Sequence, residues 1–594
     1  MLHLFLQQRL QEAVAALVPD APRHSILVRP CPDPKFGDYQ TNALMALAKQ
    51  RKLNPRQLAS DVVARLRVDE WCSKVEIAGA GFLNFHLKPE AIAHTLQEAA
   101  RGQHLFFATS GQPRTVVIDF SSPNVAKAMH IGHIRSTVLG DSLARSLRLL
   151  GHRVVTDNHI GDWGTQFGML LVGWKRELDP AALQLDPIAE MERLYKKLNA
   201  ECKANPATLE LARQELVKLQ DGDPGNLAIW REMLQLSQQQ FNAIYARLNV
   251  RFDHTLGESF YNPQLKSVVQ ELRVRGLARE SEGAWCVFSD GSLPPKEDPF
   301  LKTEDGELKP NPFLIQKSDG AANYATTDLA TLAYRLQTWQ PDEIIYVTDG
   351  RQQLHFRQLF ATFQRWHPEL ADRVKLAHVW FGSILGDDGK PIKTRDGSAI
   401  KLADVLDEAE QRALAVVTEK NPELPETQRR QVARVVGLGA VKYADLLPNR
   451  QSDYIFNWDK MLALAGNTAV YLLYAYARVR SVLRKAGESN TTATAAGEAP
   501  GGSFKLEAPA ELALARHLLN FGIVLEAMAD EYRPNYLCNY LYELAGAFAR
   551  FWESCPVLKS EGIERVTRLA LCDLTGRVLR QGLDVLGIET LDEM

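Results

Sequence analysis

The chain has 594 residues, too many for a single hydrophobic core, and this length predicts about three or four domains. Hydrophobic residues make up 45% and charged residues 24% of the sequence, and we see no run of about 18 apolar residues, so we expect a globular protein that does not span a membrane. The formal net charge of −3 gives no overall indication of nucleic-acid binding, so any RNA binding must come from local basic surfaces. Seven scattered cysteines without a CxxC pair argue against a disulfide framework or a zinc module.

The first 110 residues form a predicted α+β domain. Its opening helix places Leu6 and Leu10 on one face, and two further helices are expected at 37–50 and 54–66. An alternating segment at 75–87 predicts a strand. Because an α/β pattern follows this unit, we interpret it as an appended domain.

A strand, a turn and a helix are predicted next. Residues 116–120 form a β-branched apolar run, which is typical of a buried parallel strand, and the turn residues at 121–124 end it. Leucines at helical spacing from about residue 133 predict a helix, and a second strand is expected at 152–158. Strand, helix and strand in this order form a βαβ unit, which predicts an α/β fold with a doubly wound parallel sheet.

The loop between this strand and this helix carries Lys127, His130, Ile131, Gly132 and His133. These residues suit phosphate binding, because a helix N-terminus has unpaired N–H groups and a partial positive charge. The histidines can donate hydrogen bonds, the lysine adds a mobile cation, and the glycine lets a nucleotide approach the backbone. Two other interpretations stay open here: the histidines could simply cap the helix, or they could bind zinc, for which no third ligand stands at a suitable spacing.

Residues 170–310 lose strand character, and we interpret them as an insertion that ends in a flexible polar stretch. Helices and strands alternate again at 324–385, as in a parallel α/β sheet. From about residue 404 helices dominate. A low-complexity Ala, Thr and Gly segment at 487–505 interrupts them and predicts a disordered loop.

Two sequence blocks resemble a known family. SSPNVAKAMHIGHIRST (121–137) looks like the HIGH signature of class I aminoacyl-tRNA synthetases in its arginyl form, and DNHIGDWGTQFG (157–168) resembles the block that follows it in the same enzymes. The similarity to arginyl-tRNA synthetases extends over essentially the whole chain. It implies a tRNA-binding domain at 1–110, a Rossmann-type catalytic domain with the insertion at 111–403, and an all-α helix bundle that binds the anticodon at 404–594.

A site for arginine needs carboxylates in fork geometry around the guanidinium, with a few neutral acceptors. Asp119 lies at a predicted strand end, and Tyr324 and Asp328 share a helix face at i, i+4. These three residues match the guanidinium-binding residues of the family. The resemblance implies further residues that hold the backbone end of the amino acid: Asn124, His133 and Gln352, with Ser122 beside them.

The resemblance assigns ATP to two loops. One is the HIGH loop with the preceding lysine. The other is GKPIKTRDG at 389–397, a degenerate counterpart of the family's KMSKS loop, which by itself would be a solvated hairpin. Because a clear final lysine is missing there, Lys127 is expected to compensate. The predicted ATP-binding residues are His130, Ile131, Gly132, His133, Lys127, Lys393 and Arg395, and the predicted catalytic residues are His130, His133, Lys127 and Lys393.

The implied reaction joins L-arginine to tRNA(Arg) through an arginyl-adenylate, with ATP as substrate, Mg²⁺ accompanying the ATP, and no zinc. By the same resemblance Phe82 would stack on a tRNA base and Asn84 would read its edge, although the residue alone favours an ordinary core position for Phe82. We expect a cytoplasmic monomer that contacts no membrane and activates arginine only when tRNA is present. Two alternatives stay open: a HIGH-type nucleotidyl transferase for another small molecule, and a non-catalytic tRNA-binding relative.

Overall fold

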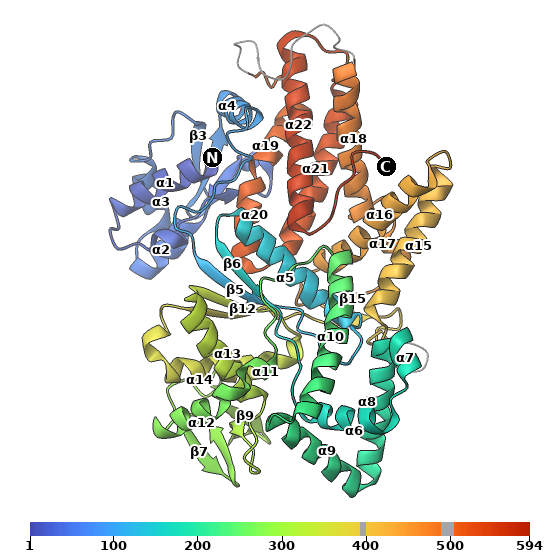
Figure 1. Ribbon diagram of the computed structural model, residues 1–594. Coiled ribbons are helices and arrows are strands. Elements are labelled where there is room, and N and C mark those ends of the chain that lie inside the picture. The colour runs from blue at the N-terminus through green and yellow to red at the C-terminus, as the bar shows by residue number, and fades with distance from the viewer. Residues whose placement is uncertain (393–398, 489–503) are drawn as a thin grey trace. The chain divides into compact units, whose positions relative to one another are not determined.

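The computed structural model describes residues 1–392, 399–488 and 504–594, and they form two compact units (Figure 1). One unit combines residues 1–110 with residues 462–594, and the other consists of residues 111–461. The boundary before the C-terminal helices therefore falls after residue 461, whereas the sequence pattern placed it at residue 403. Each unit is described by itself below.

The second unit is built on a four-stranded parallel sheet with the strand order β13-β12-β5-β6. The prediction of a doubly wound parallel sheet is confirmed. The chain runs from β5 outward to β6, and later returns to the opposite side of β5 to form β12. The carboxyl ends of β5 and β12 therefore flank the topological switch point, where open α/β sheets bind ligands. The strands are β5 (Thr115–Asp119), β6 (Arg153–Asp157), β12 (Glu343–Tyr346) and β13 (Lys375–His378).

Helices cover both faces of this sheet. On one face α13 (Tyr324–Trp339) and α14 (Gln353–Trp366) pack into a hydrophobic core with Val117, Val155 and Ile344 from three strands. α5 (Gly132–Leu149) lies on the other side (Figure 1), where Gly140 leaves room for the ring of Phe120, which follows β5. The helix predicted from about residue 133 is thus present.

The first half of the predicted insertion is helical, as expected. Four of its helices begin with an Asp or Asn whose side chain accepts a hydrogen bond from a backbone amide of the first turn, followed by a proline. This pairing favours a helix start, because proline has no amide that needs a partner there. The helices are α6 (Thr165–Glu177), α7 (Pro180–Leu185), α8 (Pro187–Ala204), α9 (Pro206–Gln220) and α10 (Pro224–Arg247).

The second half of the insertion corrects the prediction, because it contains strands. Three of them form an antiparallel sheet in the order β11-β8-β7, and β9 pairs with β10 as a hairpin inside the stretch predicted to be flexible. Asp305 and Gly306 connect the hairpin with positive φ angles of 55° and 82°, so the Asp-Gly pair was the sequence signal for this turn. The elements are α11 (Glu258–Tyr261), α12 (Leu265–Val274), β7 (Ala278–Ser281), β8 (Ala284–Val287), β9 (Leu301–Glu304), β10 (Glu307–Pro310) and β11 (Phe313–Gln316).

Residues 402–461 belong to the sheet unit because buried contacts attach them to it. Arg135 of α5 lies 3.1 Å from Asp445 of α16, and both side chains are buried. A short strand after β13 also pairs in parallel with one near residue 454. These long-range contacts explain why residues 402–461 join the sheet unit. The elements are β14 (Ile384–Leu385), α15 (Leu402–Lys420), α16 (Glu426–Leu446), β15 (Tyr454–Ile455) and α17 (Trp458–Met461).

The other unit contains the predicted α+β domain, with an antiparallel sheet in the order β1-β2-β4-β3. The single strand predicted at 75–87 is a hairpin, because Gly79 and Gly81 adopt positive φ angles of 52° and 134° and reverse the chain. The elements are α1 (Leu2–Ala15), β1 (Arg29–Pro30), β2 (Tyr39–Thr41), α2 (Ala43–Arg51), α3 (Pro55–Val63), β3 (Cys72–Ala78), β4 (Phe82–Leu87) and α4 (Pro89–Ala100).

The rest of this unit is helical. The segment Pro509–Glu531 is apolar enough on average and long enough to cross a membrane by length and composition, although charged residues such as Glu511 and Arg516 interrupt it. In the structure it forms two helices, and Leu514, Leu518 and Leu525 are buried in the core, as in a core helix of a helical domain. The predicted loop at 487–505 lies mostly outside the described residues. The helices are α18 (Ala469–Glu488), α19 (Pro509–Leu519), α20 (Phe521–Glu531), α21 (Pro534–Ser554) and α22 (Gly562–Val585).

Candidate functional site

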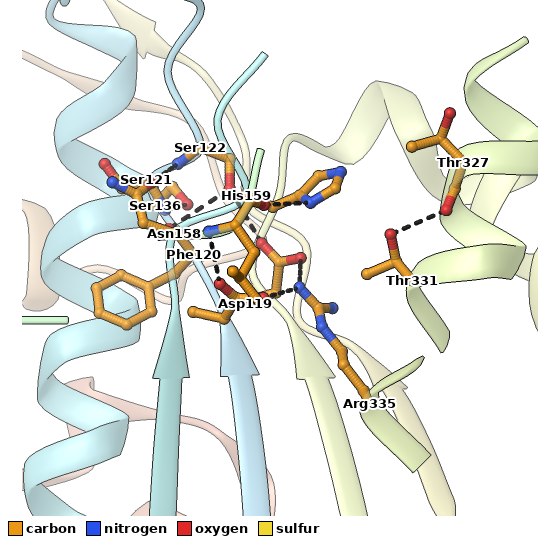
Figure 2. A network of polar contacts seen from close by, with 12 residues as sticks. Asp119, Phe120, Ser121, Ser122, Ser136, Asn158, His159, Thr327, Thr331 and Arg335 are labelled. Atoms are coloured by element: carbon orange, nitrogen blue, oxygen red, sulfur yellow. Dashed lines mark hydrogen bonds and ion pairs between the residues drawn. The ribbon is translucent and has the colours of Figure 1, made fainter. Parts of the chain in front are cut away.

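The loop between β5 and α5 is held in an unusual backbone conformation. Ser121, Ser122 and Ala126 have positive φ angles of 72°, 48° and 60°, which residues with a Cβ rarely adopt. Side chains from other elements hold the first two amides in place: Ser136 accepts a hydrogen bond from the Ser121 amide at 2.8 Å, and Asn158 accepts one from the Ser122 amide at 3.0 Å (Figure 2). Such strain persists only where the surroundings enforce it, and it is concentrated at functional sites.

The two histidines of the HIGH loop lie side by side, with ring centroids 3.9 Å apart. The amide of Gly132 donates to Nδ1 of His130 at 3.1 Å, and the amide of His130 donates to Nδ1 of His133 at 3.0 Å. His133 Nδ1 also lies 3.3 Å from the His130 carbonyl. The contact with the His130 amide is shorter, and an amide N–H can only donate, so Nδ1 is the acceptor there. Both Nδ1 atoms therefore accept, and in each neutral ring the proton sits on Nε2.

The histidines are uncharged at neutral pH. Burial, with a smaller contribution from the neighbouring His130, lowers the pKa of His133 to about 3. Partial desolvation at the mouth of a cavity lowers the pKa of His130, and the positive charge of Arg351 adds to the effect. Both side chains thus offer neutral N–H donors, so a cation for phosphate must come from other residues.

Gly132 is needed for a steric reason that the sequence did not indicate. A Cβ at this position would lie 2.9 Å from two ring atoms of His130. The absence of a side chain at Gly132 therefore leaves room for the His130 ring, which accepts a hydrogen bond from the Gly132 amide. Close approach of a nucleotide, the predicted reason for this glycine, is compatible with the same geometry.

The HIGH loop lines a cavity of about 690 Å³. Cationic side chains surround it, with two carboxylates among them. A cavity of this volume is large enough for a nucleotide, and its cations favour an anionic ligand. The predicted residues Asn124, Lys127, His130 and His133 line it together with Glu192, Arg193 and Lys196 of α8 and with Lys401 and Asp404 near the start of α15.

The segment that follows the predicted second ATP loop is hydrogen-bonded to the HIGH loop. The Ile131 amide donates to the Ile400 carbonyl at 2.9 Å, and the Leu402 amide donates to the Met129 carbonyl at 2.8 Å. Lys393 and Arg395 lie outside the described residues. The backbone pairing nevertheless places residues 400–402, which follow that loop in the sequence, next to the histidines, and this contact connects sequence segments about 270 residues apart.

Asp119 already holds a guanidinium, that of Arg335 on α13. One Nη of Arg335 lies 2.6 Å from Asp119 and 2.8 Å from Asp157 at the end of β6, and all three side chains are buried (Figure 2). The other carboxylate oxygen of Asp119 accepts a hydrogen bond from Ser122 at 3.0 Å. Both oxygens of Asp119 therefore have partners within the protein. Its predicted contact with the substrate guanidinium stays a prediction.

We expect Arg335→Met to lower the free energy of unfolding by about 3 to 5 kcal/mol, because it leaves two buried carboxylates without their counter-charge. Without Arg335 the pKa of the buried Asp157 carboxyl would rise further above its unfolded value, so the stability of the variant should fall as pH increases. Urea unfolding at pH 5 and pH 8 should thus show a larger loss at pH 8. Arg357→Met, at an exposed arginine of α14, is the control, and an equal loss at both pH values would contradict the assignment.

The predicted guanidinium residues of α13 meet a histidine from α14. Asp328 accepts a hydrogen bond from Nε2 of His355 at 2.6 Å, and the ring of Tyr324 lies 4.9 Å from the His355 ring. Tyr324 is 63% exposed, so its hydroxyl is open to a ligand. Sequence reasoning missed His355, because nothing in the local pattern showed that α14 would place it against Asp328. Gln352 ends a short turn after β12 and is exposed.

Glu258 is a second functional candidate that the sequence reasoning missed. The pKa of its carboxyl is raised to about 7. Burial is the main cause and the charges of Asp328 and Asp162 contribute, whereas His159 and the Trp163 amide oppose the increase. A perturbed carboxyl near Asp328 is typical of a functional site. The start of α11 places it there, and this helix was hidden in the segment interpreted as an insertion.

Comparison with known proteins identifies the family. A model described as tRNA synthetases class I (R), catalytic domain, matches residues 95–458. Models of the arginyl tRNA synthetase N terminal domain and of the DALR anticodon binding domain match residues 4–87 and 472–594. The arginine–tRNA ligase of Chromobacterium violaceum is 45% identical over 100% of both chains. The chain belongs to the arginyl-tRNA synthetases.

Other arginyl-tRNA synthetases show the same extent of similarity. The arginine–tRNA ligase of Hahella chejuensis is 44% identical over 99% of this chain and 100% of its own. The solved arginyl-tRNA synthetase of Thermus thermophilus is 26% identical and covers all of both chains with a TM-score of 0.82. That of Plasmodium falciparum has a TM-score of 0.79 at 26% identity, over 100% of this chain and 99% of its own.

The predicted tRNA residues of this synthetase lie on β4. Phe82 is partly buried at the start of the strand, next to the glycine hairpin. Asn84 is only 4% exposed, in the middle of the sheet between β2 and β3, and its Oδ1 has no hydrogen-bond partner among the described residues. Phe82 is thus the more accessible of the two, and base reading by Asn84 stays a prediction.

Proposed function

We propose that this cavity and the adjacent carboxylates activate arginine with ATP and then transfer the arginyl group to tRNA(Arg), which makes the chain an arginine–tRNA ligase. The observation that carries the proposal is the position of the cationic HIGH-loop cavity and of Asp328 on one sheet unit, in a chain that belongs to this family throughout. The arginine carboxylate attacks the α-phosphate of ATP, giving arginyl-adenylate and pyrophosphate. The terminal ribose of tRNA then takes the arginyl group and releases AMP.

In this proposal the HIGH loop stabilises the charge that develops on the phosphates. The Nε2–H groups of His130 and His133 donate hydrogen bonds to phosphate oxygens, and Lys127 supplies the positive charge that the neutral histidines lack. Most of the catalysis is positioning and charge stabilisation, so no covalent enzyme intermediate is needed. Ile131 and Gly132 contribute backbone at the helix start, and Lys393 and Arg395 of the second loop add positive charge.

Asp328 and Glu258 are the carboxylates that we assign to the substrate guanidinium. Tyr324 adds a neutral hydroxyl acceptor on the same helix face as Asp328. Asp119, whose oxygens also contact Arg335 and Ser122, is the third carboxylate that we propose for the guanidinium. The residues that we propose at the backbone end of the amino acid are Asn124, His133 and Gln352, with Ser122 beside them.

Arginine should bind about tenfold more weakly at pH 6 than at pH 8, because Glu258 must ionise to pair with a guanidinium and its pKa is raised to about 7. Without arginine, the raised pKa of Glu258 stabilises the folded protein only at low pH, where the carboxyl is protonated. This stabilisation is lost as the pH rises from the pKa of the unfolded chain through about 7. Calorimetric titration with arginine at both pH values measures the effect. Glu258→Gln should remove most of the dependence, and a variant that kept it would contradict this role.

ATP–pyrophosphate exchange with each amino acid, with and without tRNA(Arg), tests the function. Exchange should require arginine and tRNA together. Exchange that proceeds without any tRNA and with a different small molecule would favour another HIGH-type nucleotidyl transferase. Absence of exchange under all conditions, with tRNA binding intact, would favour a non-catalytic relative.

The remaining assignments are proposals of the same kind. Mg²⁺ accompanies ATP and is held mainly by the phosphates, and the reaction uses no zinc. The protein acts as a monomer in the cytoplasm without a membrane partner, a compartment that suits seven cysteines, none of which forms a disulfide in the described part of the chain. Phe82 and Asn84 contact the tRNA body, and the C-terminal helices contact the anticodon. Gel filtration with light scattering tests the oligomeric state.

A further inference from the structure

Two helices of the insertion hold the backbone on either side of Lys127. The amide of Ala126 donates to the hydroxyl of Ser237 on α10 at 2.9 Å, and the amide of Ala128 donates to the carboxylate of Glu192 on α8 at 3.0 Å. Ala126 is in the left-handed region at φ 60°, so this backbone requires support from its surroundings. The backbone amides of the residues before and after Lys127 are therefore both held by the insertion.

The side chain of Lys127 is held by the same helix as its backbone. Its Nζ lies 5.1 Å from the ring centroid of Tyr195, three residues after Glu192 on the same face of α8. An aromatic face attracts an ammonium without accepting a conventional hydrogen bond and without a negative charge. The three N–H groups of Lys127 thus stay available for phosphate oxygens. A carboxylate in place of the ring would neutralise the cation.

Glu192 does not neutralise this cation either, because its carboxylate has other partners. One oxygen accepts from the Ala128 amide, and the other lies 3.7 Å from Nζ of Lys196 one turn along α8. The helix therefore fixes the position of Lys127 and at the same time preserves its charge. Glu192 and Tyr195 both lie in the insertion, far in sequence from the HIGH loop.

We propose that Glu192 and Tyr195 are positioning residues, which set the ammonium of Lys127 for contact with the ATP phosphates. This inference rests on the role proposed above for Lys127. It adds to that role a physical link by which the insertion controls the activation step: a shift of α8 moves the Lys127 backbone and its ammonium together.

The test is a double-mutant cycle on arginine activation, measured by ATP–pyrophosphate exchange in the presence of tRNA(Arg). Tyr195→Leu should lower kcat about 3- to 10-fold with the KM for arginine nearly unchanged, whereas Tyr195→Phe should retain the wild-type rate, since it keeps the aromatic face. Glu192→Ala should give a similar loss, and Glu192→Gln a smaller one, because the amide oxygen can still accept from Ala128. Lys197→Ala, which removes a cation of α8 paired with Glu177, is the control.

The cycle separates this inference from the role of Lys127 itself. In a Lys127→Ala background, Tyr195→Leu should cause no further loss, because its effect acts through the missing ammonium. A full additional loss in that background would overturn the positioning inference and leave the role of Lys127 intact. A Lys127→Ala variant that is as fast as wild type would overturn the role of Lys127 instead. If Tyr195→Leu fails to fold, the Glu192→Ala and Glu192→Gln pair carries the same cycle.

Discussion

Replacing Asp328 with asparagine should raise the KM for arginine about 100-fold or more, because the change removes one carboxylate from a guanidinium site and leaves the shape of the side chain. The KM for ATP should change little, since the HIGH-loop cavity does not include this residue. Steady-state ATP–pyrophosphate exchange with separate titrations of arginine and ATP, in the presence of tRNA, measures both values.

A matched control for Asp328→Asn exists in the same region. Asp319 is exposed in the turn before α13, and its carboxylate accepts only from the nearby Ala321 amide among the described hydrogen bonds. Asp319→Asn removes the same charge and should leave both KM values close to wild type. Equal losses of arginine and ATP affinity in the Asp328 variant would indicate a damaged fold and would contradict a specific role in arginine recognition.

Lys127→Ala should slow arginine activation about 100- to 1,000-fold, the range seen when one group that stabilises developing charge is removed. The physical reason is specific to this site. His130 and His133 are neutral near pH 7, so residues 121–133 contain no charged cation once the lysine is gone. Single-turnover formation of arginyl-adenylate measures the step directly, and Lys197→Ala again controls for the loss of one positive charge on the surface.

Transfer of arginine from preformed adenylate to tRNA should be less sensitive to the same variant. The pyrophosphate has already left at that stage, so the charge that Lys127 stabilises is smaller. Comparable losses in both half-reactions would mean that Lys127 has a general structural role. A loss of less than about threefold in activation would mean that another cation of the cavity, such as Lys401, performs the task.

Local spacing was sufficient to predict the parts of the site that lie on one segment. The βαβ unit, the helix that begins at the HIGH loop and the shared face of Tyr324 and Asp328 all follow from periodicity within a few residues. The hairpin of β9 and β10 could also have been predicted from Asp305-Gly306, but the surrounding polar residues suggested a flexible stretch. The polar residues around this turn conceal its Asp-Gly signal.

Partners that come from distant segments could not be predicted in this way. Arg335 donates a hydrogen bond to Asp119, which lies 216 residues earlier in the sequence. Nothing in the sequence around Arg335 distinguishes it from other residues of its helix. His355 and Glu258 reach Asp328 only because α14 and α11 pack near α13. Likewise, nothing in the sequence links Tyr195 to Lys127, since the insertion folds back onto the loop only in three dimensions.

The sequence by itself determined the family, the parallel sheet, and the presence of a phosphate-binding loop, because these depend on short patterns whose physics is local. The tertiary structure alone decided which carboxylates are available to a substrate and which protonation states the site adopts. Burial and the nearest charges set both properties, and these are fixed only when segments hundreds of residues apart are packed together.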